Sequence, residues 1–146
     1  MNHSPAYILA QYLIDEGLLT DSTESDDWKV YVGSLPDGSL TGHNAVGCMD
    51  TAPVKDGRIM GGAPLFHHGI QLLIRSTGYN EGYTKASALA AALAEVVNEE
   101  VFVSSLYSYE IANVTQTTGV VVLGQEEGTK RREMFSVNFL ATLKEV

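Results

Sequence analysis

Residues 66–99 constrain the fold of this chain more than any other segment. Residues 66–76 predict a β-strand, with the apolar side chains Phe66, Ile70, Leu72, Leu73 and Ile74. Residues 76–80, STGYN, carry the glycine and asparagine that are typical of a turn. Residues 81–99 repeat apolar side chains at helical spacing and predict a helix, with Asn80 as its N-cap. A strand, a turn and a helix in this order favour a sheet with a helix packed against it.

The predicted helix is apolar on more than one side. One stripe comprises Tyr83, Ala86, Leu89, Ala90, Leu93, Val96 and Val97. Three further alanines, Ala88, Ala91 and Ala92, lie elsewhere around the cylinder. A helix that is covered on one side only would carry more charge on the other side. We therefore expect this helix to be covered by more than one neighbour.

The N-terminal third predicts a second helix and two short strands. Residues 4–17 begin with Ser4 as a capping residue and Pro5 at the first helical position, and Gly17 can end the helix. Residues 20–27 are polar and predict a loop. Alternation predicts a strand at 28–32, with Trp28, Val30 and Val32 on its buried side, and a further strand is expected at 45–49. Residues 35–39 have turn chemistry.

Residues 50–65 predict a long loop, because they hold three glycines and two prolines. Long loops inside compact domains are uncommon and often functional. The tip sequence GRIMGG within this segment matches neither the phosphate-binding P-loop nor the dinucleotide-binding pattern. It therefore predicts a flexible loop without a phosphate site.

The last third of the chain predicts strands. They are expected at 107–116, 120–123 and 134–143, with a turn or protruding loop at 124–131. In the last strand Phe135, Val137 and Phe139 alternate with polar residues, which is the usual pattern of an antiparallel sheet with one buried face. The expected architecture is a single α+β domain, residues 1–146, in which two helices cover one face of a mainly antiparallel sheet.

The charge and the cysteine content exclude several classes of protein. The formal net charge is −9, and no basic stripe is present for binding nucleic acid phosphates. The single cysteine, Cys48, cannot form an internal disulfide. No secretory signal and no membrane-length apolar run is visible, which predicts a soluble protein made in the cytoplasm. Charged residues make up 18% of the chain against about 25% in typical domains, which favours a surface that is partly covered by a partner.

Structural roles are the favoured interpretation of the residues whose side chains could bind a metal or react. His67 and His68 are neighbours on a predicted strand and point to opposite faces, so they are poorly placed to share a metal ion. Cys48 is expected to be an inert thiol near the core. Arg75 ends a strand, and three roles remain open for it: a solvated side chain, an ion pair with Asp50 or Asp56, or a contact with another subunit. The sequence predicts no catalytic residue, no metal site and no cofactor.

Four segments in order resemble the tail-terminator proteins of long-tailed phages, a family of small tail-completion or minor capsid proteins. They are WKVYVGSLPD, CMDTAPVKDGR, HHGIQLLIRSTGYNEGYTKASALAAAL and RREMFSVNFLATLKEV. The positions that carry the resemblance are Asp50, Thr51, Arg58, Gly69, Ile70, Gln71, Ile74, Arg75, Tyr79, Tyr83, Arg132, Phe135, Ser136, Asn138 and Phe139. One departure is Ala52-Pro53, where the family pattern has a glycine-richer loop.

The resemblance implies a structural protein of the virion tail and neck. Such proteins form a homo-oligomeric ring, usually a hexamer, which caps the tail tube protein and offers a docking face to the head–tail connector. It implies no membrane and no sequence-specific nucleic acid as partners, although DNA passes through the ring. The candidate interface residues on this basis are Asp50, Arg58, Arg75, Tyr79, Tyr83, Arg131, Arg132 and Asn138.

Two alternatives remain open at this point. The chain can instead be a neck or head-completion protein that binds the connector. It can also be a small α+β enzyme or ligand-binding domain that uses His67, His68 and Asp50 around a metal or a pocket. The first alternative shares the structural class of a terminator, whereas the second predicts a bound metal or a defined cavity.

Overall fold

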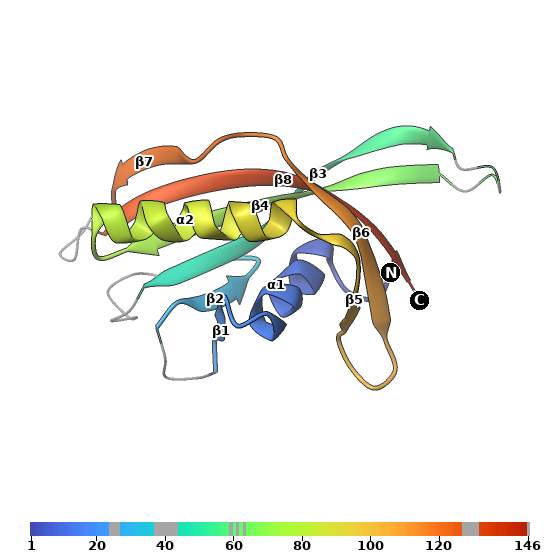
Figure 1. Cartoon of the computed structure of the whole chain (residues 1–146), viewed down its shortest axis with the longest axis horizontal. Helices are drawn as coiled ribbons and strands as arrows, with labels where there is room; N and C mark the ends of the chain where they lie inside the picture. Colours follow the sequence, from blue (N-terminus) through green and yellow to red (C-terminus); the bar gives the residue numbers. More distant parts are fainter. Residues whose placement is uncertain are drawn as a thin grey trace.

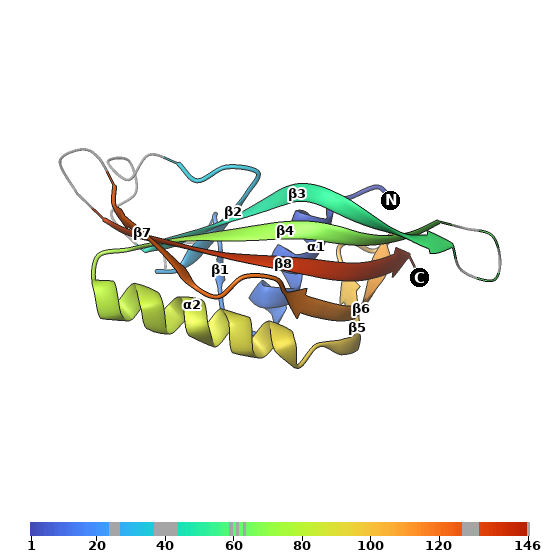
Figure 2. The ribbon, with the colours of Figure 1, turned by 90° about the horizontal axis from the view of Figure 1, so that it is seen from above.

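The computed structural model describes residues 1–23, 27–36, 44–58, 60, 62, 64–126 and 132–145, with the backbone alone at 56, 64 and 65 (Figure 1). The elements are α1 (Pro5–Asp15), β1 (Thr20–Asp21), β2 (Lys29–Val32), β3 (Ala45–Arg58), β4 (Pro64–Ser76), α2 (Tyr79–Ala94), β5 (Val97–Phe102), β6 (Ser108–Gln116), β7 (Val121–Gln125) and β8 (Glu133–Glu145). The long strands β3, β4 and β8 run side by side along the whole molecule (Figure 2).

Within the described residues the strands form one mixed sheet in the order β1-β2-β3-β4-β8-β6-β5. The pairs β1–β2 and β2–β3 are parallel, and the other pairs are antiparallel. β6 pairs with the C-terminal part of β8, and β7 pairs with its N-terminal part. The predicted α+β class with a mainly antiparallel sheet is therefore confirmed.

Both helices pack on the same face of the sheet, as the sequence predicts. Val46, Ile74 and Phe135 are directly paired across β3, β4 and β8, so their buried side chains point to one face. On that face the thiol of Cys48 donates to the carbonyl of Ala6 in α1 at 3.2 Å. Gly82 of α2 lies against Phe135 on the same face. The buried apolar residues of both helices and the sheet form one continuous core.

α1 begins and ends where the sequence predicts. The hydroxyl of Ser4 accepts a hydrogen bond from the N–H of Tyr7 at 3.2 Å, and Pro5 occupies the first turn. Gly17 follows the helix with a φ of 74°, a backbone conformation that suits glycine.

α2 differs from its prediction at both ends. Its N-cap is Gly78, which has no side chain to form a cap, and the expected cap residue Asn80 lies in the first turn. The helix ends at Ala94, and Val97 begins β5, which the sequence did not separate from the helix. Pairing with β6 from Val97 onward overrides the helical spacing, and Asn98 adopts a left-handed φ of 50° that helices do not accept.

The predicted long loop at 50–65 is wrong. β3 runs to Arg58, and β4 begins at Pro64 and pairs with it in a long hairpin. Pro53 and Gly57, two of the residues that argued against a strand, fall where the ladder is interrupted. Register irregularities lie between Thr51 and Val54 and between Lys55 and Arg58, and Gly57 there has a φ of 72°. β-Bulges therefore accommodate residues that a regular ladder would exclude.

The predicted strand at 28–32 is only partly confirmed. Trp28 precedes the strand with a left-handed φ of 57°, and the ammonium group of Lys85 in α2 lies 5.3 Å from its ring centroid. Val30 is buried as expected, but Val32 is exposed. β2 is short, and an alternation inferred from so few residues wrongly predicted that Val32 is buried.

The buried side chain of Asn44 joins four segments at the start of β3. Its amide group donates to carboxylate oxygens of Asp27 at 3.0 Å and Glu81 at 2.7 Å. Its amide oxygen accepts from the N–H of Thr77 at 2.9 Å, and its own N–H donates to Asp27 at 2.7 Å. One residue thus links the segment before β2, the end of β4 and the first turn of α2.

We expect Asn44→Ala to lower the free energy of unfolding by about 2 kcal/mol, because the change removes three part-buried hydrogen bonds made by a buried side chain. Asn80→Ala is the matched control, because Asn80 is exposed on the first turn of α2. Urea unfolding followed by circular dichroism measures both. Equal effects of the two substitutions would contradict the linking role of Asn44.

Gly82 allows α2 to approach the sheet closely. A Cβ atom at this position would lie 2.5 Å from a ring carbon of Phe135 and 2.8 Å from Cβ of Ser76. Alanine in an open helix position is more stable than glycine by about 1 kcal/mol, but here the steric clash outweighs that preference.

We therefore expect Gly82→Ala to destabilise the protein by about 1–3 kcal/mol, the opposite sign to its effect in an exposed helix. Gly119→Ala is the control, since a Cβ there meets no atom within 4 Å. Thermal unfolding of the two variants tests the packing. An increase in the melting temperature of Gly82→Ala would show that α2 does not lie this close to Phe135.

Candidate assembly surfaces

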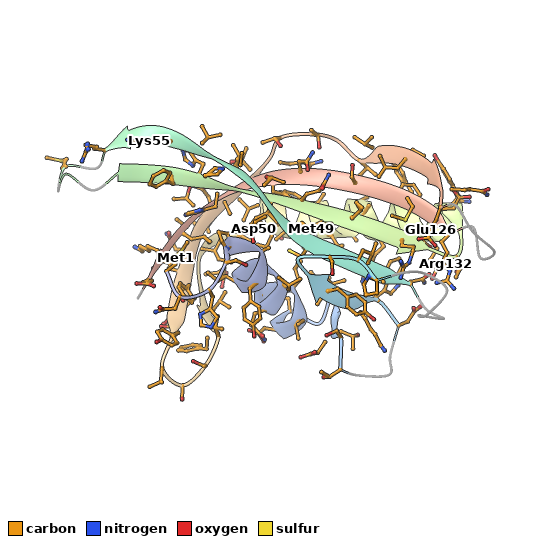
Figure 3. All side chains as sticks on the ribbon, turned by 180° about the vertical axis from the view of Figure 1, so that it is seen from behind. Met1, Met49, Asp50, Lys55, Glu126 and Arg132 are labelled. Carbon is orange, nitrogen blue, oxygen red and sulfur yellow. The ribbon has the colours of Figure 1, made fainter. Side chains whose placement is uncertain are left out.

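Four of the predicted interface residues gather at one end of the sheet. Arg75 ends β4, Arg132 precedes β8, and Tyr79 and Tyr83 belong to the first turns of α2 above Phe135. Glu126 and Arg132 lie together at this end in Figure 3. The N–H of Glu126 donates to the carbonyl of Arg132 at 2.7 Å.

Arg75 is the most deeply buried of these residues, with 1% of its surface exposed. Its guanidinium donates to the carbonyl of Pro36 and lies 3.5 Å from a carboxylate oxygen of Glu126. Of the roles left open by the sequence, a structural ion pair is correct, but its partner is Glu126 and not the expected Asp50. The side chain of the other expected partner, Asp56, lies outside the described part of the structure. The partner comes from the segment after β7, a contact between residues 51 positions apart that strand periodicity does not reveal.

Tyr79 and Tyr83 present aromatic rings at the surface of α2. Both contact Phe135 edge to face, with centroid distances of 5.5 Å and 6.3 Å. Each remains about half exposed. Tyr83 and Val97 were predicted in the buried stripe of the helix, and the structure places both at the surface instead. Ala88 and Ala91 of α2 are also exposed, and so is Glu81 in the first turn.

Asp50 and Thr51 have structural contacts within the chain. A carboxylate oxygen of Asp50 accepts from the N–H of Ala6 at 2.9 Å and so caps the N-terminus of α1 from the sheet. Thr51 lies directly over Gly69, where an added Cβ would be 2.2 Å from the threonine hydroxyl. Glycine at 69 therefore permits the close approach of β3 and β4 beside the first irregularity.

The other candidates do not join this group. Arg58 lies near the tip of the β3–β4 hairpin, and its guanidinium donates to the carbonyl of Gly62 at 2.6 Å. Asn138 lies in the middle of β8, and its backbone holds the connection after β6 through Thr117 and Thr118. Arg131 lies outside the described residues.

The histidines are arranged as strand alternation predicts. His67 pairs with Val54 and contacts the hydroxyl of Thr142 at 3.0 Å on one face. His68 pairs with the buried Ala141 on the other face, where burial lowers the pKa of its imidazole. Among the residues described, no three His, Cys, Asp or Glu side chains are grouped to hold a metal ion.

Sequence reasoning missed an aromatic cluster around His3. Nδ1 of His3 lies 2.8 Å from the hydroxyl of Tyr109, and its ring stacks on Tyr7 at 5.3 Å. Tyr107 contacts the same ring edge to face. These contacts fasten the N-terminus to β6, and only the folded chain brings positions 3 and 109 together.

Cys48 is fully buried beneath α1, as the sequence predicts. Burial raises the pKa of its thiol far above the ordinary value, and the nearby Asp50 adds to the effect. The thiolate is the nucleophilic form of cysteine, so this thiol is unreactive in the folded protein.

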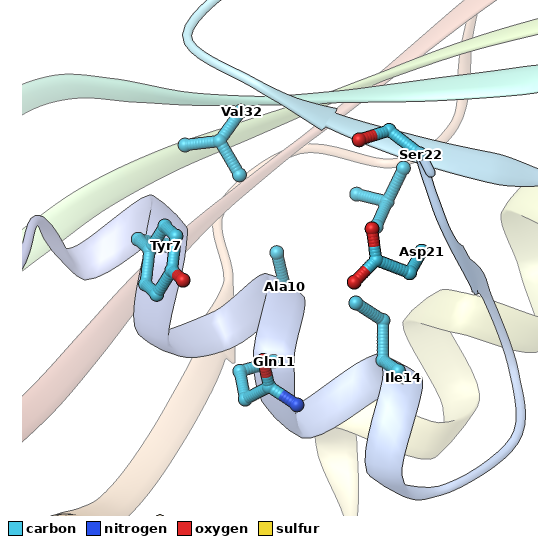
Figure 4. Close-up of a pocket in the computed structure, with 8 residues that line it drawn as sticks. Tyr7, Ala10, Gln11, Ile14, Asp21, Ser22 and Val32 are labelled. Carbon is cyan, nitrogen blue, oxygen red and sulfur yellow. The ribbon is translucent and has the colours of Figure 1, made fainter. Parts of the chain in front are cut away.

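A hollow of about 270 Å³ lies between α1 and the strands β1 and β2 (Figure 4). Tyr7, Gln11, Ile14 and Val32 line it together with Asp21. The carboxylate of Asp21 already accepts from the N–H and hydroxyl of Thr23, at 3.0 Å and 3.2 Å. The hollow is small for a ligand site and brings no charged groups together.

Most of the large exposed apolar side chains lie on the arm, on the edge strand β7 and on the β5–β6 hairpin. We define the arm as residues 52–58 of β3 and 64–67 of β4, which extend beyond the body of the sheet (Figure 1). The exposed residues are Val54, Met60 and Phe66 on the arm and its tip, Val121, Val122 and Leu123 on β7, and Val97, Phe102, Leu106 and Tyr107 on the β5–β6 hairpin. Projecting apolar residues of this kind are typical of contact surfaces with other proteins.

We expect Arg75→Ala to reduce the free energy of unfolding by about 3 kcal/mol, because it leaves the carbonyl of Pro36 and the carboxylate of Glu126 without a buried cationic partner. Arg58→Ala is the control at an exposed arginine, with an expected loss under about 1 kcal/mol. Urea unfolding measures both values. Unchanged stability of Arg75→Ala, with altered oligomer size, would assign Arg75 to a contact between subunits instead.

No helix in the described part of the chain is long and apolar enough to cross a membrane. No protein-family model matches the sequence, and no curated protein matches it.

Proposed function

We propose that this protein is a structural assembly protein of the tail-terminator kind, which forms a ring on the end of a phage tail tube. The ring would block further addition of tube subunits and present a surface to the head–tail connector. In this role the protein performs no catalysis, and its mechanism is geometric. It would be made in the host cytoplasm and become part of the virion at the junction of tail and neck.

The observation that carries this proposal is the placement of the exposed apolar side chains. Most of them lie on three separate elements, namely the arm and the β5–β6 hairpin, which project from the body of the molecule, and β7, an edge strand beside β8 (Figure 1). Each subunit of such a ring has a neighbouring subunit on two sides, the tail tube on one face of the ring and the connector on the other. Several separate apolar contact surfaces are what such a position requires.

The outer surface of α2 supports the same proposal. Tyr79 and Tyr83 expose aromatic rings, and the alanines at positions 88 and 91 are exposed farther along the helix. Aromatic residues are enriched at protein interfaces, because a rigid ring buries a large area at a small entropic cost. The helix is covered on one side by its own sheet, and its two half-exposed tyrosines offer an aromatic surface that suits a neighbour.

The net charge of −9 fits a ring through which DNA passes. A negatively charged channel wall repels phosphates and therefore does not retain the nucleic acid. The same charge disfavours a role in binding DNA, which needs clustered lysine and arginine.

Light scattering with mass analysis tests the ring directly. We expect the purified protein to form a closed oligomer of defined mass, a hexamer in the family that the sequence resembles. Negative-stain images of the same sample should show rings. When the tail tube subunit is added, the tube should stop growing in the presence of the protein.

Two outcomes would contradict the proposal. A chain that stays monomeric at every concentration, alone and with the tube subunit, is not a terminator. A ring that binds the connector and leaves tube growth unchanged is a neck or head-completion protein. Elemental analysis of the same sample tests the enzyme alternative. A stoichiometric metal would favour a metal-dependent enzyme or ligand-binding domain.

A further inference from the structure

Three glutamates from three elements gather where the two helices end. Glu16 is the C-cap of α1, and Glu95 is the C-cap of α2. Glu99 of β5 is paired with the buried Ile111, which is paired in turn with Leu143, so Glu99 lies on the face of the sheet that the helices cover. All three glutamates are exposed. We call Glu16, Glu95 and Glu99 the acidic surface.

The hydroxyl of Tyr12 in α1 lies among these carboxylates. Burial raises the pKa of this hydroxyl above its ordinary value, and the charges of Glu16, Glu99 and Glu95 raise the pKa further. The side chain of Tyr12 is nine-tenths buried, with 9% of its surface exposed. Its hydroxyl has no hydrogen-bond partner among the described residues, although a buried tyrosine normally has one. A polar group that is held in place and without a partner therefore points to the acidic surface.

No cation of the described chain offsets this negative charge. Neither helix carries a basic residue in its last turn. The carbonyl groups at the C-terminus of a helix are themselves partly negative, so an acidic cap is unfavourable there and a cation is favourable. The ion pairs within the described residues leave out all three glutamates. A cation from outside the chain would therefore stabilise this surface.

The spacing of the three carboxylates selects the kind of cation. They do not form a group that could hold a metal ion, as no three acidic, histidine or cysteine side chains do in the described part of the chain. A lysine ammonium or an arginine guanidinium carries several donors at the end of a long side chain and can bind carboxylates that lie apart. The ligand that fits is thus a basic side chain of a protein.

The arm carries basic side chains that are available for such a contact. Lys55 and Arg58 are both exposed, and neither forms an ion pair with a described residue. These two cations and one acidic residue, Asp56, give the arm a formal net charge of +1 within a chain of net charge −9. The arm therefore complements the acidic surface in charge.

The other described lysines and arginines are buried or already in contact within the chain. Arg75 and Arg132 are buried, Lys29 is half-buried, Lys85 lies over the ring of Trp28 and donates to the carbonyl of Leu18, and Lys144 pairs with Glu110.

The arm extends away from the two helices of its own chain, as Figure 1 shows, and Lys55 lies towards its outer end in Figure 3. Its cations are therefore directed towards another molecule. The arm and the acidic surface are different parts of the subunit, so a contact between them joins copies head to tail. Contacts of this type close a ring when the rotation between copies allows.

We propose that Lys55 and Arg58 on the arm of one copy bind the acidic surface of the next copy. The oxygen of the Tyr12 hydroxyl accepts a hydrogen bond from the bound ammonium or guanidinium group. This inference rests on the ring proposed above and names a contact that holds neighbouring subunits together. The acidic caps that are unfavourable in a single chain become favourable in the assembled ring.

Reversing one charge on each side tests the contact in the full chain. Lys55→Glu changes the arm, and Glu99→Lys changes the acidic surface. Each substitution places like charges opposite each other, so each variant alone should need at least about a tenfold higher concentration than the wild type to form the oligomer. Light scattering with mass analysis gives the fraction of oligomer, and far-ultraviolet circular dichroism verifies that each variant is folded.

Mixing the two variants provides the decisive measurement. In the mixture the reversed arm of Lys55→Glu meets the reversed surface of Glu99→Lys, and the unchanged arm meets the unchanged surface. We therefore expect an equal mixture to recover the oligomer, with the two kinds of chain alternating. A single chain that carries both substitutions should recover it as well.

Glu100→Lys is the matched control. Glu100 is the exposed neighbour of Glu99 on β5, and it pairs with Glu110 on the opposite face of the sheet. The substitution changes the net charge by the same amount as Glu99→Lys. We expect the oligomer mass of Glu100→Lys to equal that of the wild type.

Several results would overturn the contact while the ring proposal stands. One is an oligomer that persists unchanged in Lys55→Glu or in Glu99→Lys. Another is dissociation of both variants without recovery in the mixture. A third is equal dissociation of Glu100→Lys, which would assign the effect to net charge. If the wild-type protein is itself monomeric, the ring proposal fails and the contact fails with it.

Discussion

The hydrogen bonds of Asn44 determine how the elements of this protein meet. A single buried amide contacts Asp27 before β2, Thr77 after β4 and Glu81 in the first turn of α2. These contacts set where β3 begins and the direction in which the chain leaves β4 for the helix. Because a buried amide must satisfy its donors and its acceptor, other arrangements of these segments would leave polar groups unpaired at a substantial cost.

The position of α2 depends on this junction and on Gly82. The helix leaves β4 through residues 77 and 78 and immediately lies against Phe135 of β8. Only a residue without a side chain can stand at this point of contact. The close approach covers one side of α2 and leaves Tyr79, Tyr83 and several alanines on the other side. The outward surface of the helix is therefore a consequence of how its inward surface packs.

The length of β3 and β4 gives the molecule its extended form. Both strands continue past the point where β2 and β8 stop pairing with them, and the result is the arm. At the other end β7 occupies the part of β8 that β6 has left. The sheet thus has a projecting hairpin at one end and an uncharged free edge at the other. The ring proposed above uses this difference between the two ends of the subunit.

Several residues that carry the resemblance to the phage family have a structural role within the single chain. Asp50 caps α1, Gly69 makes room for Thr51, and Arg75 joins the segment at Pro36 to Glu126. Such residues maintain the fold and do not by themselves indicate an interface. Tyr79 and Tyr83 of that set are about half exposed, whereas the exposed apolar side chains of β7 lie outside it.

The sequence by itself determined the elements whose signal is local. The capped helix α1, the apolar strand β4 and the alternating strand β8 follow from capping chemistry and from side-chain periodicity, which depend on near neighbours in the chain. The buried Cys48 and the opposite faces of His67 and His68 follow in the same way. Tertiary structure decided the rest. The arm exists because cross-strand pairing tolerates the irregularities at Pro53 and Gly57, and β5 exists because β6 lies beside it. The partners of Arg75 and His3 lie 51 and 106 positions away, and no local pattern encodes contacts at that separation.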